Sequence, residues 1–124
     1  MKIKSGTDII EIDRIKEAIE SQGERFLKRV FTEKEIEYCE SKKAQKYQHY
    51  AGRFAAKEAI FKAISESLPD KFALGWSDYE ILNDETGRPS VKIERNYLSD
   101  IENIDISISH CKQYAVATVV ATYK

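Results

Sequence analysis

The sequence predicts an α+β fold, in which a small antiparallel sheet packs against one long central helix. The helix is predicted by Arg53 to Ser67, which reads RFAAKEAIFKAISES and meets no helix breaker before Pro69. The sheet is predicted by the alternation of apolar and polar residues further along the chain, most clearly over residues 104–110. A length of 124 residues suffices for one hydrophobic core, so we expect a single domain over residues 1–124.

The composition is typical of a soluble globular protein, with 42% hydrophobic and 33% charged residues. No apolar run approaches the roughly 18 residues of a membrane span, and the N-terminal MKIKSGTD has no secretory signal. Cys39 and Cys111 are too few and too far apart for a disulfide framework or a zinc site. We therefore expect a cytoplasmic protein whose partners include neither a membrane nor a nucleic acid.

Charge is distributed unevenly, although the net charge is only −1. Residues 1–62 contain 14 basic and 11 acidic side chains, whereas residues 63–124 contain 6 and 10. Over residues 42–62, Glu58 is the one acid beside six basic residues: Lys42, Lys43, Lys46, Arg53, Lys57 and Lys62. This suits a compact phosphorylated ligand or an acidic protein partner, while a solvated helix face accounts equally well for some of these lysines.

The first element is predicted to be a strand over residues 2–12. Asp8 shares a face with the apolar Ile10 and Ile12, and an acid on the buried face of a strand is unusual. An aspartate at a strand end that makes a turn or capping bond is the alternative, and this segment alone leaves both open. Gly6 would let another part of the chain approach the backbone closely.

Asp13 is expected to cap a helix over Arg14–Gln22 that Gly23 ends, and a second short turn follows over Glu24–Val30. Basic and apolar side chains are interleaved in this region, at Arg14, Arg25, Phe26, Leu27, Lys28 and Arg29. That pattern suits docking of an acidic amphipathic helix, and it is equally compatible with an ordinary surface.

A third helix is predicted over Glu33–Glu40, because Thr32 and Glu35 match a capping box. Phe31 and Ile36 supply the matching hydrophobic staple. After a polar joint, the long helix is expected to start near Ala44.

One acid of the long helix falls within an apolar stripe. At about 100° per residue, Glu58 shares a stripe with Tyr47, Tyr50, Ala51, Phe54, Phe61, Ser65 and Leu68. Carboxylates are rarely buried unless they are paired, so a metal ion or another cation is implied close to Glu58. Lys62 lies one turn further on and can reach the same space, and a surface ion pair between Glu58 and Lys62 is the alternative.

The remainder is predicted to form strands and turns, in this order: a strand over Tyr79–Leu82, a turn over Asn83–Gly87, a strand over Arg88–Ile93, one or two helical turns over Asn96–Ile101, a strand over Ile104–His110 and its hairpin partner over Tyr114–Thr122. His110 ends the apolar face of its strand. A lone histidine there is more often structural than catalytic.

Three of these patterns occur together in one order: Gly6-Thr7-Asp8-Ile9 running on to Arg14-Ile15, Phe54-Ala55-Ala56-Lys57-Glu58-Ala59 with Lys62, and Ser107-Ile108-Ser109-His110. The chain thereby closely resembles the holo-acyl-carrier-protein synthases, the short single-domain branch of the 4′-phosphopantetheinyl transferases. The first two motifs are specific and the third is weaker alone. The resemblance implies a 4′-phosphopantetheinyl transferase-like fold for the whole chain.

The resemblance also implies an activity, the transfer of the 4′-phosphopantetheine group from coenzyme A to a serine of apo-acyl carrier protein. Adenosine 3′,5′-bisphosphate would be released, and the reaction would support fatty acid biosynthesis. Asp8 and Glu58 match the family's metal ligands, and magnesium suits two carboxylates without soft ligands. Glu58, or water on the metal, would take the serine proton, and Lys62 would neutralise a phosphate oxygen.

Coenzyme A is expected to contact Arg53, Lys62 and His110, together with a loop at Gly87, Arg88 and Pro89 that resembles the family loop near the nucleotide. That loop usually carries a lysine where Arg88 stands, and the segment from Ser67 to Asp78 fits no family pattern. Two rivals remain: a non-catalytic module that binds a nucleotide or an acidic protein, and a metal-dependent phosphohydrolase. Such hydrolase sites usually contain more carboxylates or histidines than this sequence assembles.

Two kinds of partner follow from the same resemblance. Arg14 and Arg25 are expected to be polar anchors for the acidic helix of the carrier protein, and Phe26 its apolar anchor. A homotrimer is expected because the segment 114–121 is apolar on both faces, whereas a strand with one wet face should alternate. The short branch is known for threefold assembly, so active sites at the subunit boundaries are predicted.

Overall fold

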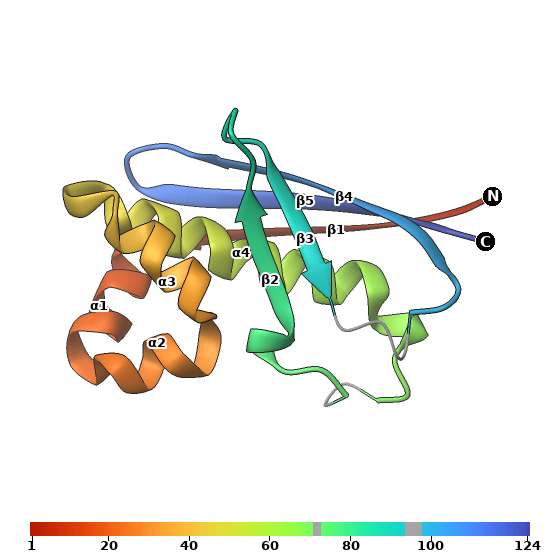
Figure 1. The fold of residues 1–124 in the computed structure, drawn as a ribbon, viewed down its shortest axis with the longest axis horizontal. Coiled ribbons are helices and arrows are strands. Elements are labelled where there is room, and N and C mark those ends of the chain that lie inside the picture. Colours follow the sequence, from red (N-terminus) through yellow and green to blue (C-terminus); the bar gives the residue numbers. More distant parts are fainter. Residues whose placement is uncertain (71–72, 94–97) are drawn as a thin grey trace.

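The computed structural model describes residues 1–70, 73–93 and 98–124, and it confirms the predicted α+β class (Figure 1). Its main elements are β1 (Lys2–Glu11), α1 (Ile12–Gln22), α2 (Glu24–Val30), α3 (Glu33–Glu40), α4 (Lys46–Ile64), β2 (Tyr79–Asn83), β3 (Pro89–Ile93), β4 (Ile101–His110) and β5 (Tyr114–Tyr123). Three short 3-10 turns lie over Lys43–Gln45, Ser65–Ser67 and Trp76–Asp78.

The larger sheet has three strands in the order β1-β5-β4, and both strand pairs are antiparallel. β1 and β5 pair from Lys2 opposite Tyr123 to Glu11 opposite Tyr114, so the two ends of the chain lie side by side. β2 and β3 form a separate hairpin. Figure 1 shows α4 running along the larger sheet, with α1, α2 and α3 gathered near its N-terminal end.

α4 is covered on two sides. Ala59 lies against Gly6 of β1, while Lys57 bonds to the carbonyl oxygen of Tyr79 at the start of β2. Two residues apart on a helix, these side chains point in nearly opposite directions. The predicted apolar stripe is therefore buried only in part. Tyr50 and Ala51 are fully buried and Phe54 and Phe61 only half-buried, while alanines and isoleucines on the other faces are fully buried too.

The helix starts follow the sequence with one exception. The capping box is confirmed, because the Thr32 side chain accepts from the Glu35 backbone N–H and the Glu35 side chain accepts from the Thr32 backbone N–H. Gly23 ends α1 with a positive φ of 59°, which glycine adopts more readily than other residues. Asp13, however, does not cap α1. The helix begins directly after the strand at Ile12, whose N–H donates to the carbonyl oxygen of Gln113.

The predicted strands are confirmed with small changes at their ends. The helical turns expected over Asn96–Ile101 lie partly outside the described residues. Within the described part, Leu98 to Asp100 form a turn and Ile101 already belongs to β4. No helix among the described residues is long and apolar enough to cross a membrane.

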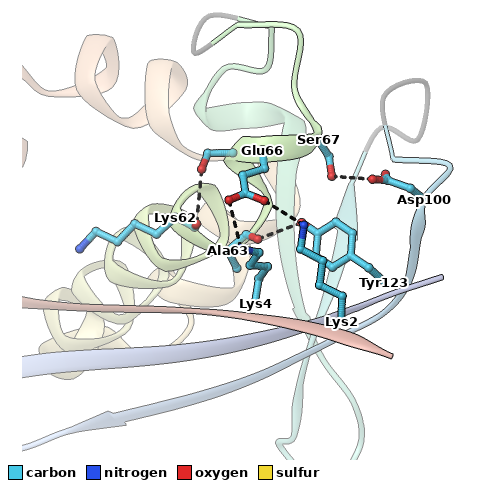
Figure 2. A network of polar contacts seen from close by, with 9 residues as sticks. Lys2, Lys4, Lys62, Ala63, Glu66, Ser67, Asp100 and Tyr123 are labelled. Carbon is cyan, nitrogen blue, oxygen red and sulfur yellow. Dashed lines mark hydrogen bonds and ion pairs between the residues drawn. The ribbon is translucent and has the colours of Figure 1, made fainter.

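A polar network fastens the C-terminal end of α4 to the sheet (Figure 2). Glu66 accepts from Lys4 at 3.0 Å and from Lys2 at 3.4 Å, both on β1. The Tyr123 hydroxyl of β5 donates to the carbonyl oxygen of Ala63 at 3.0 Å. The end of the helix is thus tied to both strands that carry the chain termini.

The face of the sheet away from α4 carries apolar side chains that the described residues leave open. On β5, Ala115, Ala117, Val119 and Ala121 are buried against the helix, while Val120 and Tyr114 point the other way and are 38% and 43% exposed. Ile3 and Ile9 of β1 lie on the same outer face, at 60% and 63% exposed. β5 is therefore apolar on both faces, as its sequence predicts, and in this chain one face is covered.

Candidate functional site

The site is built where β1 crosses α4. Gly6 permits this crossing, because a Cβ atom at Gly6 would lie 2.0 Å from the carbonyl oxygen of Ala59. Asp8 follows on the same face of β1, in mid-strand and opposite Ala117, so it is not the strand-end residue of the alternative interpretation. Glu58 is the neighbour of Ala59 on α4. The close approach of strand and helix therefore brings the two predicted acids to one place.

Asp8, Glu58 and Lys62 form one charged cluster. The Lys62 ammonium donates to Asp8 Oδ1 at 3.2 Å and to the carbonyl oxygen of Thr7 at 2.8 Å. Lys62 thus pairs with Asp8 and not, as the simpler interpretation held, with Glu58. Burial and the neighbouring Asp8 carboxylate raise the pKa of Glu58, and the Lys62 ammonium opposes that shift. Glu58 is consequently easier to protonate than an exposed glutamate.

The donor set fits a hard divalent cation. Asp8 and Glu58 both supply carboxylate oxygens, and they repel each other across the site unless a cation lies between them. Among the described residues, no cluster of three or more histidine, cysteine or acidic side chains could hold a metal by itself. Two carboxylates with room for water and phosphate oxygens suit magnesium better than zinc.

A pocket of about 400 Å³ opens beside Glu58. The side of α4 contributes Lys57, Glu58 and Phe61, and the segment before β2 contributes the opposite wall at Leu74, Gly75, Trp76 and Tyr79. The Trp76 ring also stacks on Phe54, with centroids 4.8 Å apart. The segment from Ser67 to Asp78, for which the sequence suggested no role, therefore supplies part of the site wall.

A second pocket, of about 190 Å³, collects most of the residues predicted to contact coenzyme A. It is lined by Arg53, Gly87, Pro89 and His110 from that prediction, and also by Tyr38, Gln48, His49, Gly52, Asn83 and Ile108. Its walls come from α3, α4, the β2–β3 turn and the end of β4. Arg53 is the residue of this pocket that lies nearest to Glu58 along α4. The two are five residues apart, or roughly 8 Å along the helix axis.

Arg53 is held tightly in this second pocket. It is 3% exposed, its guanidinium lies 4.2 Å above the Tyr38 ring, and its Nη2 donates to Asn83 Oδ1. Its Nε is buried and has no hydrogen-bond partner among the described residues. A buried cation with an unused donor at a pocket wall is suited to an anionic ligand.

His49 is a member of this pocket that the sequence analysis missed. Its ring meets Tyr38 and His110 edge-on, at centroid distances of 5.6 and 5.9 Å. Burial, with help from the cations Lys42 and Arg53, lowers the pKa of His49 to about 4, so the ring is neutral at pH 7. Its position one turn before Arg53 on the same helix face was the available signal.

Four predicted residues lie elsewhere. Arg88 is exposed and pairs with Asp105 at 3.1 Å instead of lining the pocket, and Lys62 belongs to the acid cluster. Lys57 was counted among the basic residues for a ligand, but it is fully buried in an ion pair with Glu35. Phe26 is wrong as an exposed anchor: it is 6% exposed and packs edge-on against Phe31.

Comparisons with known proteins agree with this arrangement. The model of the 4′-phosphopantetheinyl transferase superfamily matches residues 4–119. A holo-[acyl-carrier-protein] synthase of Ruminiclostridium cellulolyticum is 49% identical over 97% of this chain and 92% of its own. Its counterpart in Protochlamydia amoebophila is 46% identical over 97% of this chain and 98% of its own.

Solved structures agree as well. The holo-(acyl-carrier-protein) synthase of Bacillus anthracis, in complex with CoA (3′,5′-ADP), has a TM-score of 0.80 and 32% identity, covering 98% of this chain and 96% of that one. The Helicobacter pylori holo-[acyl-carrier-protein] synthase in complex with coenzyme A has a TM-score of 0.81 and 28% identity, covering 95% and 99%. The fold, the motifs and the relatives together show that the chain belongs to the holo-[acyl-carrier-protein] synthases, which are transferases of the 4′-phosphopantetheinyl transferase superfamily.

Proposed function

We propose that this chain transfers the 4′-phosphopantetheine group of coenzyme A to a serine of apo-acyl carrier protein, with Asp8 and Glu58 as the protein ligands of one magnesium ion. The observation that supports this most is the meeting of two carboxylates, from β1 and α4, beside the pocket that Glu58 lines. Bound magnesium would offset charge on the pyrophosphate oxygens. A binding module without catalysis has no use for two acids placed together at a cost in stability.

The side chains around the acids have separate tasks. Lys62 is the cation beside Asp8, and it neutralises phosphate oxygens that enter the cluster. Glu58, or water on the metal, would accept the proton of the attacking serine. Adenosine 3′,5′-bisphosphate is the leaving group of the transfer, and it would dissociate from the side of the second pocket.

The second pocket is proposed to bind the nucleotide end of coenzyme A. Arg53 has a free donor there, and the rings of His49 and His110 give the walls an aromatic surface. Gly87 and Pro89 close the pocket from the β2–β3 turn. The apolar pocket beside Glu58 lies further along α4, towards the reacting phosphate and the pantetheine arm.

We propose that the carrier protein docks on the exposed surface of α1 and α2. Arg14 and Arg25 are both exposed and remain the polar anchors. Since Phe26 is buried, the half-buried Leu27 takes over the apolar contact. An acidic helix meeting this surface would be attracted by its arginines, and added salt would weaken that attraction.

We also propose a homotrimer, assembled through the outer face of the β1-β5-β4 sheet. Ile3, Ile9, Tyr114 and Val120 are large apolar side chains on that face, and a soluble monomer rarely leaves such a group uncovered. Closed cyclic symmetry would bury the same pair of surfaces three times and would place a neighbour beside each site. Light scattering behind a sizing column tests this, and a fully active monomer at micromolar concentration would refute it.

One assay tests the transfer itself. The chain is incubated with coenzyme A, magnesium chloride and an apo-acyl carrier protein, and the carrier is weighed by mass spectrometry. A carrier that gains the mass of phosphopantetheine supports the proposal. Binding of coenzyme A without any adduct would instead favour the non-catalytic module, and phosphate release without a carrier would favour a hydrolase. The cytoplasmic location stays a prediction, which cell fractionation checks.

A further inference from the structure

Glu35 of α3 and Lys57 of α4 form an ion pair at 2.7 Å in which both side chains are fully buried. Neither residue belongs to the magnesium cluster or to the nucleotide pocket described above. Lys57 is nevertheless the residue before Glu58, and it lines the same pocket. The pair therefore lies directly behind the proposed reacting groups.

Both charged groups of this pair are hydrogen-bonded several times. The Lys57 Nζ donates to Glu35 Oε1 at 2.7 Å, to the Trp76 carbonyl at 2.9 Å and to the Tyr79 carbonyl at 2.6 Å. Three acceptors require three N–H bonds, so the group is an ammonium ion and not a neutral amine.

The Glu35 carboxylate accepts three hydrogen bonds, one of them from Lys57. Its Oε1 also accepts from the Thr32 backbone N–H, and its Oε2 accepts from the backbone N–H of Ile81, both at 2.9 Å. Two side chains thus connect the first turn of α3, the middle of α4, and the chain from Trp76 to Ile81. These are the elements that meet around the site.

Stability alone does not explain such a pair. Buried ion pairs are costly to desolvate, and apolar residues of similar volume often replace them at no loss of stability. Apolar residues would not supply directional bonds. The Lys57 ammonium does, because its hydrogen bonds fix the carbonyls of Trp76 and Tyr79 relative to one turn of α4. That turn carries Glu58, and Trp76 and Tyr79 form the opposite wall of its pocket.

We propose that Glu35 and Lys57 are positioning residues, which hold Glu58 and the Trp76–Tyr79 wall at the separation that the transfer reaction requires. The inference rests on the function proposed above, and it adds residues that do not touch substrate. Without the pair, α4 and the segment before β2 lose the hydrogen bonds that fix their relative position, and the stacking of Trp76 on Phe54 is a less directional contact. Misplacement of a reacting group by about 1 Å costs on the order of 100-fold in rate. The docking arginines lie on α1 and α2, to which neither side chain bonds.

The test uses two variants of the full chain. Glu35→Gln keeps the shape of the side chain, and glutamine also completes a capping box, so α3 retains its start. The double variant Glu35→Gln with Lys57→Met removes both charges and leaves no unpaired ion in the core. Val119→Ala in β5, also fully buried, is the control for lost stability without contact to the pair. Circular dichroism and melting establish which proteins are folded at the assay temperature.

Steady-state transfer is then measured with coenzyme A and apo-carrier protein. We expect kcat to fall about 10- to 100-fold in both variants, while the KM for the carrier changes less than threefold and Val119→Ala keeps its kcat. A folded variant with wild-type kcat, or an equal loss of kcat in Val119→Ala, would overturn the inference. If the double variant does not fold, the kcat of the Glu35→Gln variant alone decides the test. A wild-type chain that transfers nothing would overturn the proposed function instead.

Discussion

Substitution of Gly6 by alanine should separate β1 from α4 at the point where the site is built. The new Cβ would lie 2.0 Å from the Ala59 carbonyl oxygen, 3.0 Å from its carbonyl carbon and 3.1 Å from the backbone nitrogen of Ala63. All three atoms are backbone atoms, so no change of side-chain rotamer relieves the collision. Ordinary contact begins near 3.4 Å, and β1 must therefore retreat by about 1.4 Å.

Two consequences of Gly6→Ala can be given magnitudes. Overpacking of this kind costs about 1–3 kcal/mol of unfolding free energy, and each kcal/mol lowers the melting temperature by about 4 °C in a chain of this size. Asp8 lies two residues away on the same face and moves with the strand. A displacement above 1 Å between Asp8 and Glu58 should lower kcat on the order of 100-fold.

The assay separates these two effects. Melting is followed by calorimetry, and kcat is measured at saturating magnesium, well below the melting temperature of the variant. Ile106→Val serves as the matched control: it lies on β4 of the same sheet, is 4% exposed and should cost about 0.5–1.5 kcal/mol without touching the crossing. A folded Gly6→Ala chain with wild-type kcat would show that the close approach does not set the site.

The other predictions concern the metal, the coenzyme, the carrier and pH. Asp8→Asn and Glu58→Gln should each remove nearly all transfer and leave the fold intact, with equal or higher melting temperature without magnesium, because the acid repulsion is gone; most activity retained at saturating magnesium would contradict this. Dephospho-coenzyme A should bind more weakly than coenzyme A in calorimetry, and equal affinity would argue against a 3′-phosphate contact in the Arg53 pocket. Reversal of Arg14 and Arg25 to glutamate should raise the KM for the carrier far more than that for coenzyme A, and normal docking of this double variant would exclude the α1–α2 surface. The folded state keeps His49 neutral, so the unfolded chain takes up a proton first as pH falls from about 6.5 to about 4. Part of the unfolding free energy should be lost as the pH falls through that range. Denaturant titrations of His49→Gln should show that this part of the pH dependence has disappeared, and an unchanged pH dependence would count against a neutral His49.

Local patterns predicted most of the elements. The capping box at Thr32 and the alternation in β4 identify their elements without tertiary information, because their signals come from neighbouring residues. The two acids of the site could also be identified, since Asp8 and Glu58 each stand among apolar positions. The sequence could not show that Lys62 bonds to Asp8, because that contact joins residues 54 positions apart.

The failures arise where packing between elements, and not the local pattern, decides which side chains are buried. Covered on two sides, α4 buries Lys57 in its ion pair with Glu35, although the uneven charge placed Lys57 among basic residues suited to a ligand or an acidic partner. Phe26 was taken as exposed because arginines flank it, yet it turns inward beneath Arg29. Such outcomes depend on which elements pack together, and that information lies in contacts between distant segments.

The pairing of β1 with β5 has a consequence for how the enzyme is made. Within this chain, the strand that bears Asp8 precedes the other described elements, and the strand that it pairs with follows them. β1 is an edge strand whose partner in the described sheet is β5, so β1 lacks that partner until β5 has been made. Contacts between residues so far apart form slowly. The proposed metal site is therefore expected to be among the later features of this chain to assemble. Asp8 lies opposite Ala117 of β5, so a chain that lacks β5 should carry both acids without holding them together.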